Sequence, residues 1–334
     1  MLFRSQAGLW DGLAAQAMPL RVMRIVDAAG QLVTRDFDAS DLGDGPFGWN
    51  LPNSLLRAVL AEAAAGLPNL TVLADGFADM LVRDAAALVR LTSGLRIAAR
   101  LVIGADGRTS PVRVAAGIGA RTIRYGQKAL VFTVAHALPH DNISTEVHQS
   151  GGPFTLVPLP DGADGLPRSS VVWMDRGEAA DRWAALPDAD FALAATQRSG
   201  SVLGPLSVIS PRQVWPIIAQ HADRLTGPRM LLMAEAAHVL PPIGAQGFNL
   251  SLKDIGVLTG LLPAPPGDPG SPGVLAAYAR ARRGVLALRL TGIDLLNRAS
   301  MAAAAPVTRL RARTIGALHD LASLRRALMR LGLG

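Results

Sequence analysis

The sequence predicts an α/β protein, in the broad sense that includes α+β folds, and three observations point to this class. Short apolar and β-branched runs recur between residues 70 and 174, which favours strands. Residues 53–65 and 273–298 carry the spacing of amphipathic helices. Residues 230–254 join an apolar run to a turn rich in proline and glycine, and then to a helical pattern.

The first fifty residues predict a helix, a hairpin and a loop. Residues 1–16 favour a helix, and residues 21–37 favour a β-hairpin around Ala28-Ala29-Gly30. A Gly-x-Gly-x-x-Gly pattern occurs at residues 43–48. A polar stretch precedes it and Pro52 follows it, so it predicts a surface loop and not a dinucleotide-binding turn.

The helix predicted over residues 53–65 has Asn53 or Ser54 as its N-cap. Its expected apolar face comprises Leu56, Val59, Leu60 and Ala63. Further strands are expected after it, at residues 70–73, 80–83, 87–92, 95–103, 129–135, 144–148, 154–158 and 170–174. Residues 263–272 predict a connector, and residues 273–298 and about 314–331 predict helices with an Arg-rich face.

The strand expected over residues 95–103 ends in Gly104-Ala105-Asp106-Gly107. A strand that ends in such a turn lets the backbone approach a phosphate closely, while Asp106 orients the loop. Arg108 and Arg113 could either meet phosphates or close the loop internally.

The stretch from Met230 to Asp254 carries the main candidate site. An apolar run over residues 230–234 favours a buried strand, and Glu235 stands where that strand ends. A rigid turn then leads into a helix from about Asn249. Its residues are Pro241, Pro242, Gly244 and Gly247. A carboxylate accepts hydrogen bonds from hydroxyls, and the N–H groups at a helix start face negative charge. His238 is assigned a structural role.

This stretch resembles the second flavin-binding motif of the aromatic-ring hydroxylases, the class A flavin monooxygenases, and most of all their ubiquinone-biosynthesis branch. The family pattern is Gly-Asp-Ala-Ala-His, then Pro-Pro-x-Gly-Ala-Gln-Gly-x-Asn, then a helix with an Asp. Here Ala234-Glu235 replace Gly-Asp. The segments Ile103 to Ser110 and Gly152 to Leu159 are similar to further family motifs.

The resemblance implies an incomplete Rossmann-like FAD-binding domain, an inserted antiparallel β-sheet substrate domain and C-terminal helices. The implied parts are residues 1–120 and 211–264 for FAD binding, 121–210 for the substrate domain, and 265–334 for the helices. No N-terminal stretch matches the family's Gly-x-Gly-x-x-Gly unit, so the resemblance also implies that this chain lacks it.

The implied reaction is FAD-dependent hydroxylation of an aromatic quinone precursor with NAD(P)H and O₂. The implied cofactor contacts are Asn53 at the pyrophosphate, Glu235 at the ribityl hydroxyls, and the N–H groups of Gly247, Phe248 and Asn249 at the flavin ring. Asn53 could equally be an N-cap only. Asp106, Gly107, Pro242 and Gly244 complete the cofactor set, and Pro241 shapes the space for flavin and substrate. No catalytic acid or base is named.

Composition limits the other classes of function. The chain has no Cys, so disulfides, thiolate metal sites and Cys nucleophiles are excluded. Its histidines show no metal-binding spacing, because Pro139 separates His136 from His140. The net charge is +7, yet aromatic residues make up only 4% and no nucleic-acid motif occurs, so nucleic acid is not an expected partner.

We expect a cytoplasmic protein, because no secretory signal or 20-residue apolar span is evident. The Arg-rich helical faces are either solvated surfaces or a peripheral contact with the inner membrane. A homo-oligomer and a larger biosynthetic complex are further partner hypotheses. The alternative function, from a different class, is a truncated non-catalytic remnant that acts as a binding or assembly module.

Overall fold

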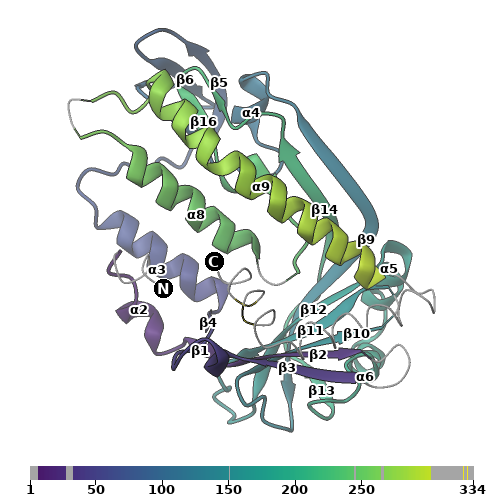
Figure 1. The fold of residues 1–334 in the computed structure, drawn as a ribbon. Coiled ribbons are helices and arrows are strands. Elements are labelled where there is room, and N and C mark those ends of the chain that lie inside the picture. The colour runs from purple at the N-terminus through teal and green to yellow at the C-terminus, as the bar shows by residue number, and fades with distance from the viewer. Residues whose placement is uncertain are drawn as a thin grey trace. The chain divides into compact units, whose positions relative to one another are not determined.

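The computed structural model describes residues 7–27, 33–149, 151–243, 246–264 and 267–301, together with Arg326 and Met329. The chain forms two compact units. Unit 1 holds Met1–Leu70, Gly126–Ile217 and Asn297–Gly334, and unit 2 holds Thr71–Tyr125 and Ile218–Leu296. Helices and strands occur in both units, which confirms the predicted α/β class (Figure 1). The predicted division into four sequence segments stays a prediction.

Unit 1 is built on one large sheet. Its strands follow the order β9-β12-β11-β10-β2-β3, and β13 pairs with the C-terminal end of β9. All these pairs are antiparallel except β10 with β2. The predicted hairpin is confirmed as β2 and β3, while its turn lies outside the described residues. The strand bounds are β2 Val22–Asp27, β3 Val33–Asp38, β9 Ala120–His136, β10 Ile143–His148, β11 Pro153–Leu159, β12 Arg168–Arg176 and β13 Leu206–Val208.

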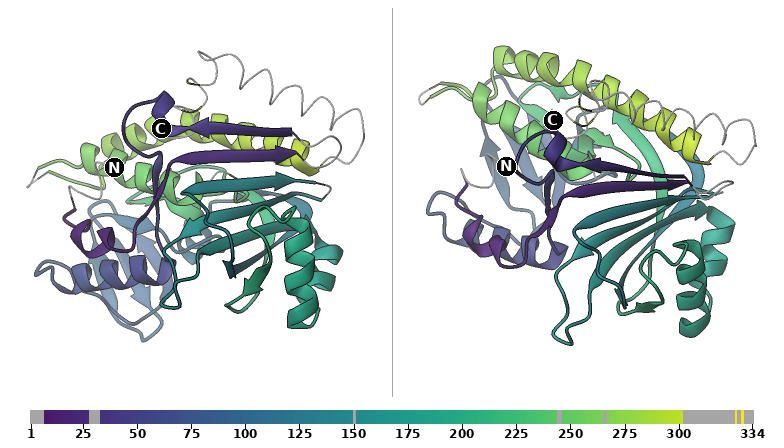
Figure 2. Two further views of the ribbon diagram at one scale, coloured as in Figure 1. Left: turned by 90° about the horizontal axis from the view of Figure 1, so that it is seen from below. Right: turned by 60° about the horizontal axis from the view of Figure 1, so that its bottom comes forward.

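One face of this sheet is covered by two helices, α5 (Gly177–Ala184) and α6 (Asp188–Arg198), as Figure 2 shows. Phe191 of α6 lies 4.9 Å from the ring of Phe132 and 5.8 Å from that of Trp173, measured between ring centroids. Trp173 and Phe191 are fully buried. Residues 121–210 were expected to form an antiparallel sheet domain, and neither helix was predicted.

The N-terminal part of unit 1 differs from the prediction. Only α2 (Asp11–Ala14) is helical among the described part of residues 1–16. β1 (Met18–Leu20) pairs with β4 (Gly48–Asn50), and a 3-10 turn, η1, spans Ala39–Asp41. Residues 43–47 form the expected loop.

Helix α3 (Asn53–Ala65) has the predicted bounds but not the predicted cap. Pro52 is its N-cap and no side chain makes a capping hydrogen bond. Asn53 is already the first helical residue, and a capping side chain belongs to the residue before it, so Asn53 does not cap the helix. The expected apolar face was also wrong in part, because no α3 residue is buried and Leu60 is 42% exposed.

Unit 2 contains two small sheets. β5 (Phe77–Val82), β6 (Ala87–Leu91) and β7 (Arg96–Ala99) form an antiparallel meander. β15 (Thr226–Gly227), β16 (Met230–Leu232) and β8 (Val102–Gly104) form the second sheet, in which β16 and β8 are parallel. Two strand predictions were wrong here. Residues 70–73 are not a strand, and residues 95–103 are split into β7 and β8, so that the chain can leave the meander and enter the parallel pair.

Strand β16 is buried on both faces, which explains its uninterrupted apolar sequence. Met230 and Leu232 pack in a cluster with Val112 of α4 (Pro111–Ala115). Leu231, on the opposite face, packs with Leu258 of α8 (Gln246–Leu261) and Tyr278 of α9 (Pro272–Met301). The two helices run side by side (Figure 1). The remaining elements of this part are α7 (Ala234–Ala237) and β17 (His238–Val239). β17 pairs with β14 (Gln213–Ala222), of which residues 218–222 belong to unit 2.

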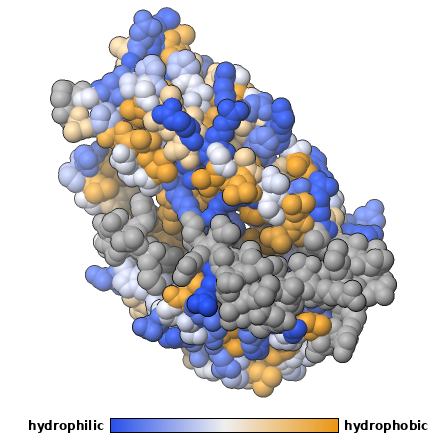
Figure 3. All heavy atoms as spheres, viewed as in Figure 1, coloured by the Kyte–Doolittle hydropathy of each residue, from blue (hydrophilic) through white to orange (hydrophobic). Residues whose placement is uncertain are grey.

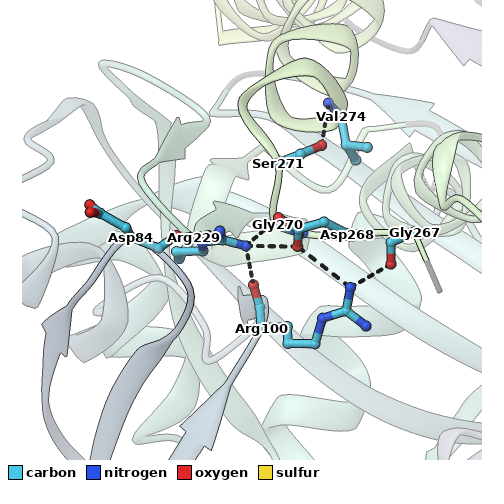
Figure 4. Close-up of polar contacts among 8 residues, drawn as sticks. All are labelled: Asp84, Arg100, Arg229, Gly267, Asp268, Gly270, Ser271 and Val274. Atoms are coloured by element: carbon cyan, nitrogen blue, oxygen red, sulfur yellow. Dashed lines mark hydrogen bonds and ion pairs between the residues drawn. The ribbon is translucent and has the colours of Figure 1, made fainter. Parts of the chain in front are cut away.

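The predicted connector between α8 and α9 is confirmed and is held by charged contacts (Figure 4). Asp268 accepts from Arg229 Nη1 at 2.6 and 2.7 Å, and Arg100 Nη2 lies 3.9 Å from it. Arg229 directly precedes β16, and Arg100 lies two residues before β8. The connector is therefore anchored where the two parallel strands begin, opposite the edge where they end.

Candidate functional site

The candidate site lies where β8 and β16 end. These strands are parallel, with Gly104 opposite Leu232, so the chain leaves both at the same edge of the sheet. A Cβ on Gly104 would stand 2.8 Å from Leu232 Cδ2 and 3.1 Å from Val112 Cγ1, which explains the glycine. The Asp106 loop and Glu235 therefore follow neighbouring strands.

Asp106 shapes the first loop. Its carboxylate accepts from Ser110 Oγ at 2.5 Å and from the Val112 N–H at 3.0 Å, which fixes the start of α4. Gly107 has φ +86°, a conformation that favours glycine, and a Cβ there would meet nothing within 4 Å. The loop thus presents open backbone at Gly107, as a close approach to a ligand requires.

Arg113 joins the two loops. It is buried, and its Nη1 donates to the Ala236 carbonyl of α7 while its Nη2 donates to the Arg108 carbonyl, both at 2.7 Å. The sequence left open whether Arg113 meets phosphates or closes the loop internally, and in the structure it closes the loop internally. It connects the Asp106 loop directly to the short helix that carries Glu235.

Glu235 is exposed in the first turn of α7 and borders a pocket of about 300 Å³. The predicted residues Gly247 and Phe248 border the same pocket. They lie in the first turn of α8, which begins at Gln246, three residues before the expected start. The full lining is Glu235, His238, Val239, Leu240, Gly247, Phe248 and Ser251. The structure thus brings a carboxylate and a helix start together.

The other predicted site residues lie around or apart from this pocket. Pro241 is buried and Pro242 is exposed, and neither is among the lining residues. Asn249 is exposed in α8, whereas Gly244 lies outside the described residues. Asn53 belongs to unit 1. Four lining residues were not assigned to the cofactor by the sequence: His238, Val239, Leu240 and Ser251. The spacing of Gly247 and Ser251 on one helix face was the available signal for the last of these.

Asp254 of α8 is buried behind the pocket, with 1% of its surface exposed. Its Oδ2 accepts from the Ala234 N–H at 2.9 Å and from His238 Nε2 at 2.7 Å, and its Oδ1 accepts from Arg282 Nε at 2.6 Å. Burial alone would raise the pKa of Asp254, but the bonds from His238 and Ala234 and the charge of Arg282 hold that pKa below its ordinary value. His238 is thus tied into the scaffold, in line with its predicted structural role.

Among the described residues there is no cluster of three or more His, Asp and Glu side chains that could hold a metal ion. The site therefore consists of an exposed carboxylate, an open glycine turn and a helix start at the carboxyl edge of parallel strands. In open α/β sheets, this edge is where nucleotide cofactors bind. Fold and site together define the class of nucleotide-cofactor-binding α/β proteins.

Comparisons with known proteins specify the family. A family model described as "FAD binding domain" matches residues 1–290. Ubiquinone hydroxylase UbiL of Rhodospirillum rubrum is 37% identical over 331 residues, which cover 98% of this chain and 76% of the relative. The 3-demethoxyubiquinol 3-hydroxylase of Escherichia coli is 28% identical, covering 76% of this chain and 64% of the relative. The chain belongs to the FAD binding domain family.

Solved structures show the same fold. The crystal structure of p-nitrophenol 4-monooxygenase PnpA from Pseudomonas putida superposes with a TM-score of 0.78 at 19% identity, covering 99% of this chain and 85% of that one. Family and relatives confirm the predicted class, an FAD-dependent monooxygenase, and its cofactor FAD. Nothing in these comparisons favours the alternative, a non-catalytic remnant.

The site residues fit this cofactor. Glu235 offers an acceptor for hydroxyls, and Gly107 leaves room for close approach of a phosphate. Gly247 also leaves its surroundings open, since a Cβ there would meet nothing within 4 Å. The first-turn N–H groups of a helix such as α8 have no partners inside the helix and favour negative charge.

Proposed function

We propose that this protein hydroxylates an aromatic ring of a quinone precursor in ubiquinone biosynthesis, using FAD, NAD(P)H and O₂. The observation that carries the proposal is that Glu235 and the first turn of α8 border one pocket at the carboxyl edge of β8 and β16. The substrate class follows from the relatives, whose names are ubiquinone hydroxylase and 3-demethoxyubiquinol 3-hydroxylase.

In this proposal, bound FAD supplies the redox chemistry that activates dioxygen for transfer of one oxygen atom to the ring. Glu235 accepts hydrogen bonds from the ribityl hydroxyls. The N–H groups of Gly247, Phe248 and Asn249 stabilise negative charge on the flavin ring. These groups position the cofactor and need not move a proton.

The remaining predicted residues complete the proposed site. The open backbone at Gly107 approaches the pyrophosphate, with Asp106 holding the loop in shape. Asn53 contacts the pyrophosphate from the start of α3. The turn with Pro241, Pro242 and Gly244 limits the space in which the flavin and the substrate meet.

The test is a reaction with isotopically labelled dioxygen. The purified chain is supplied with FAD, NADH or NADPH, and a prenylated phenol or demethoxyubiquinol. We expect NAD(P)H oxidation that depends on the aromatic substrate, and a product that contains one labelled oxygen atom. Glu235→Ala should abolish most of this product, whereas Glu178→Ala, at an exposed glutamate of α5, should not. Equal NAD(P)H oxidation without substrate, and no labelled product, would contradict the proposal.

We also propose a cytoplasmic location with peripheral contact between α9 and the inner membrane, where quinone precursors dissolve. Leu288, Leu295 and Leu296 are 70%, 62% and 59% exposed on one side of α9. Arg280 and Arg283 are exposed on the same helix, and Figure 3 shows hydrophilic and hydrophobic side chains interspersed on the face that α9 occupies. Apolar and basic side chains together favour an anionic bilayer surface. No helix in the described part of the chain is long and apolar enough to cross a bilayer.

Sedimentation with phosphatidylglycerol vesicles tests the membrane contact. Leu288→Glu should reduce the bound fraction, and Leu193→Glu should not, although Leu193 of α6 is 58% exposed. Equal binding by both variants would contradict the assignment to α9. Self-association or assembly with other biosynthetic proteins remains a partner proposal, which chromatography with light scattering would test.

A further inference from the structure

Ala234 has a backbone conformation that alanine rarely adopts. Its φ is +51°, in the left-handed region, where a side chain costs about 1–2 kcal/mol relative to glycine. It is the residue directly before Glu235 and the first residue of α7. The direction in which Glu235 leaves β16 therefore depends on an unfavourable turn that must be held by other contacts.

A single carboxylate oxygen holds both ends of α7. Asp254 Oδ2 accepts from the Ala234 N–H at the first residue of the helix and from His238 Nε2 directly after its last residue. Arg282 Nε donates to the other oxygen of Asp254 at 2.6 Å, and its Nη2 lies 3.4 Å from the Leu250 carbonyl. Because Asp254 is fully buried on α8, these bonds fix α7 relative to the helix that forms the other side of the pocket.

We propose that Asp254 is a positioning residue, which holds Ala234 in its left-handed conformation and so aims Glu235 into the pocket. The inference rests on the proposed role of Glu235 at the cofactor, but the coupling between Asp254 and Ala234 is a property of this chain alone. If Asp254 stabilises a strained turn, removing the strain with glycine should reduce the dependence on Asp254.

Asp254→Asn disrupts the contact between Asp254 and the Ala234 N–H and leaves hydrogen bonds to Arg282 and His238 possible. The guanidinium of Arg282 only donates, so the amide oxygen of the asparagine should turn toward it. The amide NH₂ then faces the Ala234 N–H, and the two donors repel. His238 can still adapt, because a neutral imidazole nitrogen can accept a hydrogen bond.

The experiment is a double-mutant cycle with wild type, Ala234→Gly, Asp254→Asn and the double variant. Two quantities are measured for each protein: the unfolding equilibrium constant of the cofactor-free chain in urea, and the FAD dissociation constant from quenching of flavin fluorescence. Asp254→Asn should weaken FAD binding at least tenfold. Adding Ala234→Gly to Asp254→Asn should tighten FAD binding again by at least threefold. Ala234→Gly should also lower the unfolding equilibrium constant, and by a larger factor in Asp254→Asn than in wild type.

Two controls make the rescue specific. Ala237→Gly changes the last residue of the same helix, which has no left-handed conformation, and should restore nothing. His238→Ala removes the hydrogen bond at the other end of α7, so Ala234→Gly should not rescue that variant. If Asp254→Asn does not fold, Asp254→Glu replaces it in the same cycle.

Additive effects in the cycle, or equal rescue by Ala237→Gly, would overturn the inference. The unfolding data test the coupling between Asp254 and Ala234 even if the chain binds no FAD. Failure of the proposed function is therefore distinguishable from failure of this inference. In that case coupling between Asp254 and Ala234 would persist without any change in cofactor affinity. With FAD bound by wild type, unchanged affinity in Asp254→Asn would contradict the positioning role.

Discussion

The guanidinium of Arg113 donates to the carbonyl of Ala236 at 2.7 Å, across 123 positions of the chain. The same side chain donates to Arg108 within its own loop. One buried cation therefore joins the loop that offers an open glycine backbone to the helix that carries the carboxylate. The two halves of the candidate site are coupled through this residue.

Replacing Arg113 with alanine should destabilise the protein strongly. Two backbone carbonyls lose a charged donor, so the free energy of unfolding should fall by about 3 kcal/mol. Urea denaturation at neutral pH measures this change. Arg224→Ala is the matched control, since Arg224 is exposed and its contacts to Ala116 and Gly117 are 3.3 and 3.4 Å long. Its effect should stay within about 0.5 kcal/mol, and equal losses would contradict the account.

Gly247→Ala should separate stability from cofactor binding. A helical alanine in place of glycine adds about 0.5–1 kcal/mol to the free energy of unfolding, and the new methyl group would meet no protein atom within 4 Å. FAD affinity should nevertheless fall, because the methyl group occupies the pocket. Gly256→Ala, in the same helix and also with open space, should stabilise equally and leave FAD affinity unchanged. Unchanged affinity in both variants would place the cofactor elsewhere.

Gly104→Ala tests the close packing of β8 on β16. The added Cβ would overlap Leu232 and Val112, so overpacking should lower the free energy of unfolding by about 1–3 kcal/mol. Gly94→Ala is a useful comparison, because Gly94 has φ +91° but open space around it, so only backbone strain of about 1 kcal/mol is expected. Thermal unfolding of both variants should rank Gly104→Ala as the less stable, and the reverse order would contradict this packing.

The carboxylate of Asp254 should make the free energy of unfolding decrease as the pH falls. Its pKa is lowered in the folded protein, since the bonds from His238 and Ala234 and the charge of Arg282 outweigh burial. Its contribution is therefore fully present above the unfolded pKa of about 3.9 and is lost as pH falls through the lower folded pKa. Urea midpoints between pH 6 and pH 3 should fall more steeply for wild type than for Asp254→Asn. Parallel curves would show that the carboxylate contributes no such dependence.

The sequence predicted what local patterns and motif order encode. The strand before Glu235, a helix near Asn249 and a loop that Asp106 orients were all expected. Helix α6 was missed because Phe191 and Ala195 bury only against a sheet formed by distant strands. Contacts between distant residues were not predicted for the same reason, since no local pattern links Arg113 to Ala236 or Asp254 to Ala234. The N-terminus of α3 shows the reverse case: a local capping signal was present at Asn53, but Pro52 is the N-cap and no side chain makes a capping hydrogen bond.

Titration of the purified chain with FAD tests the central claim most directly, with and without Glu235. We predict saturable binding of one FAD per chain. Glu235→Ala should weaken that binding at least tenfold, because a hydrogen bond to a charged group contributes about 1.5–3 kcal/mol, while Glu178→Ala should leave it unchanged. A chain that retains no yellow colour after free FAD is removed, or that binds FAD equally well without the Glu235 carboxylate, would contradict this role of the pocket.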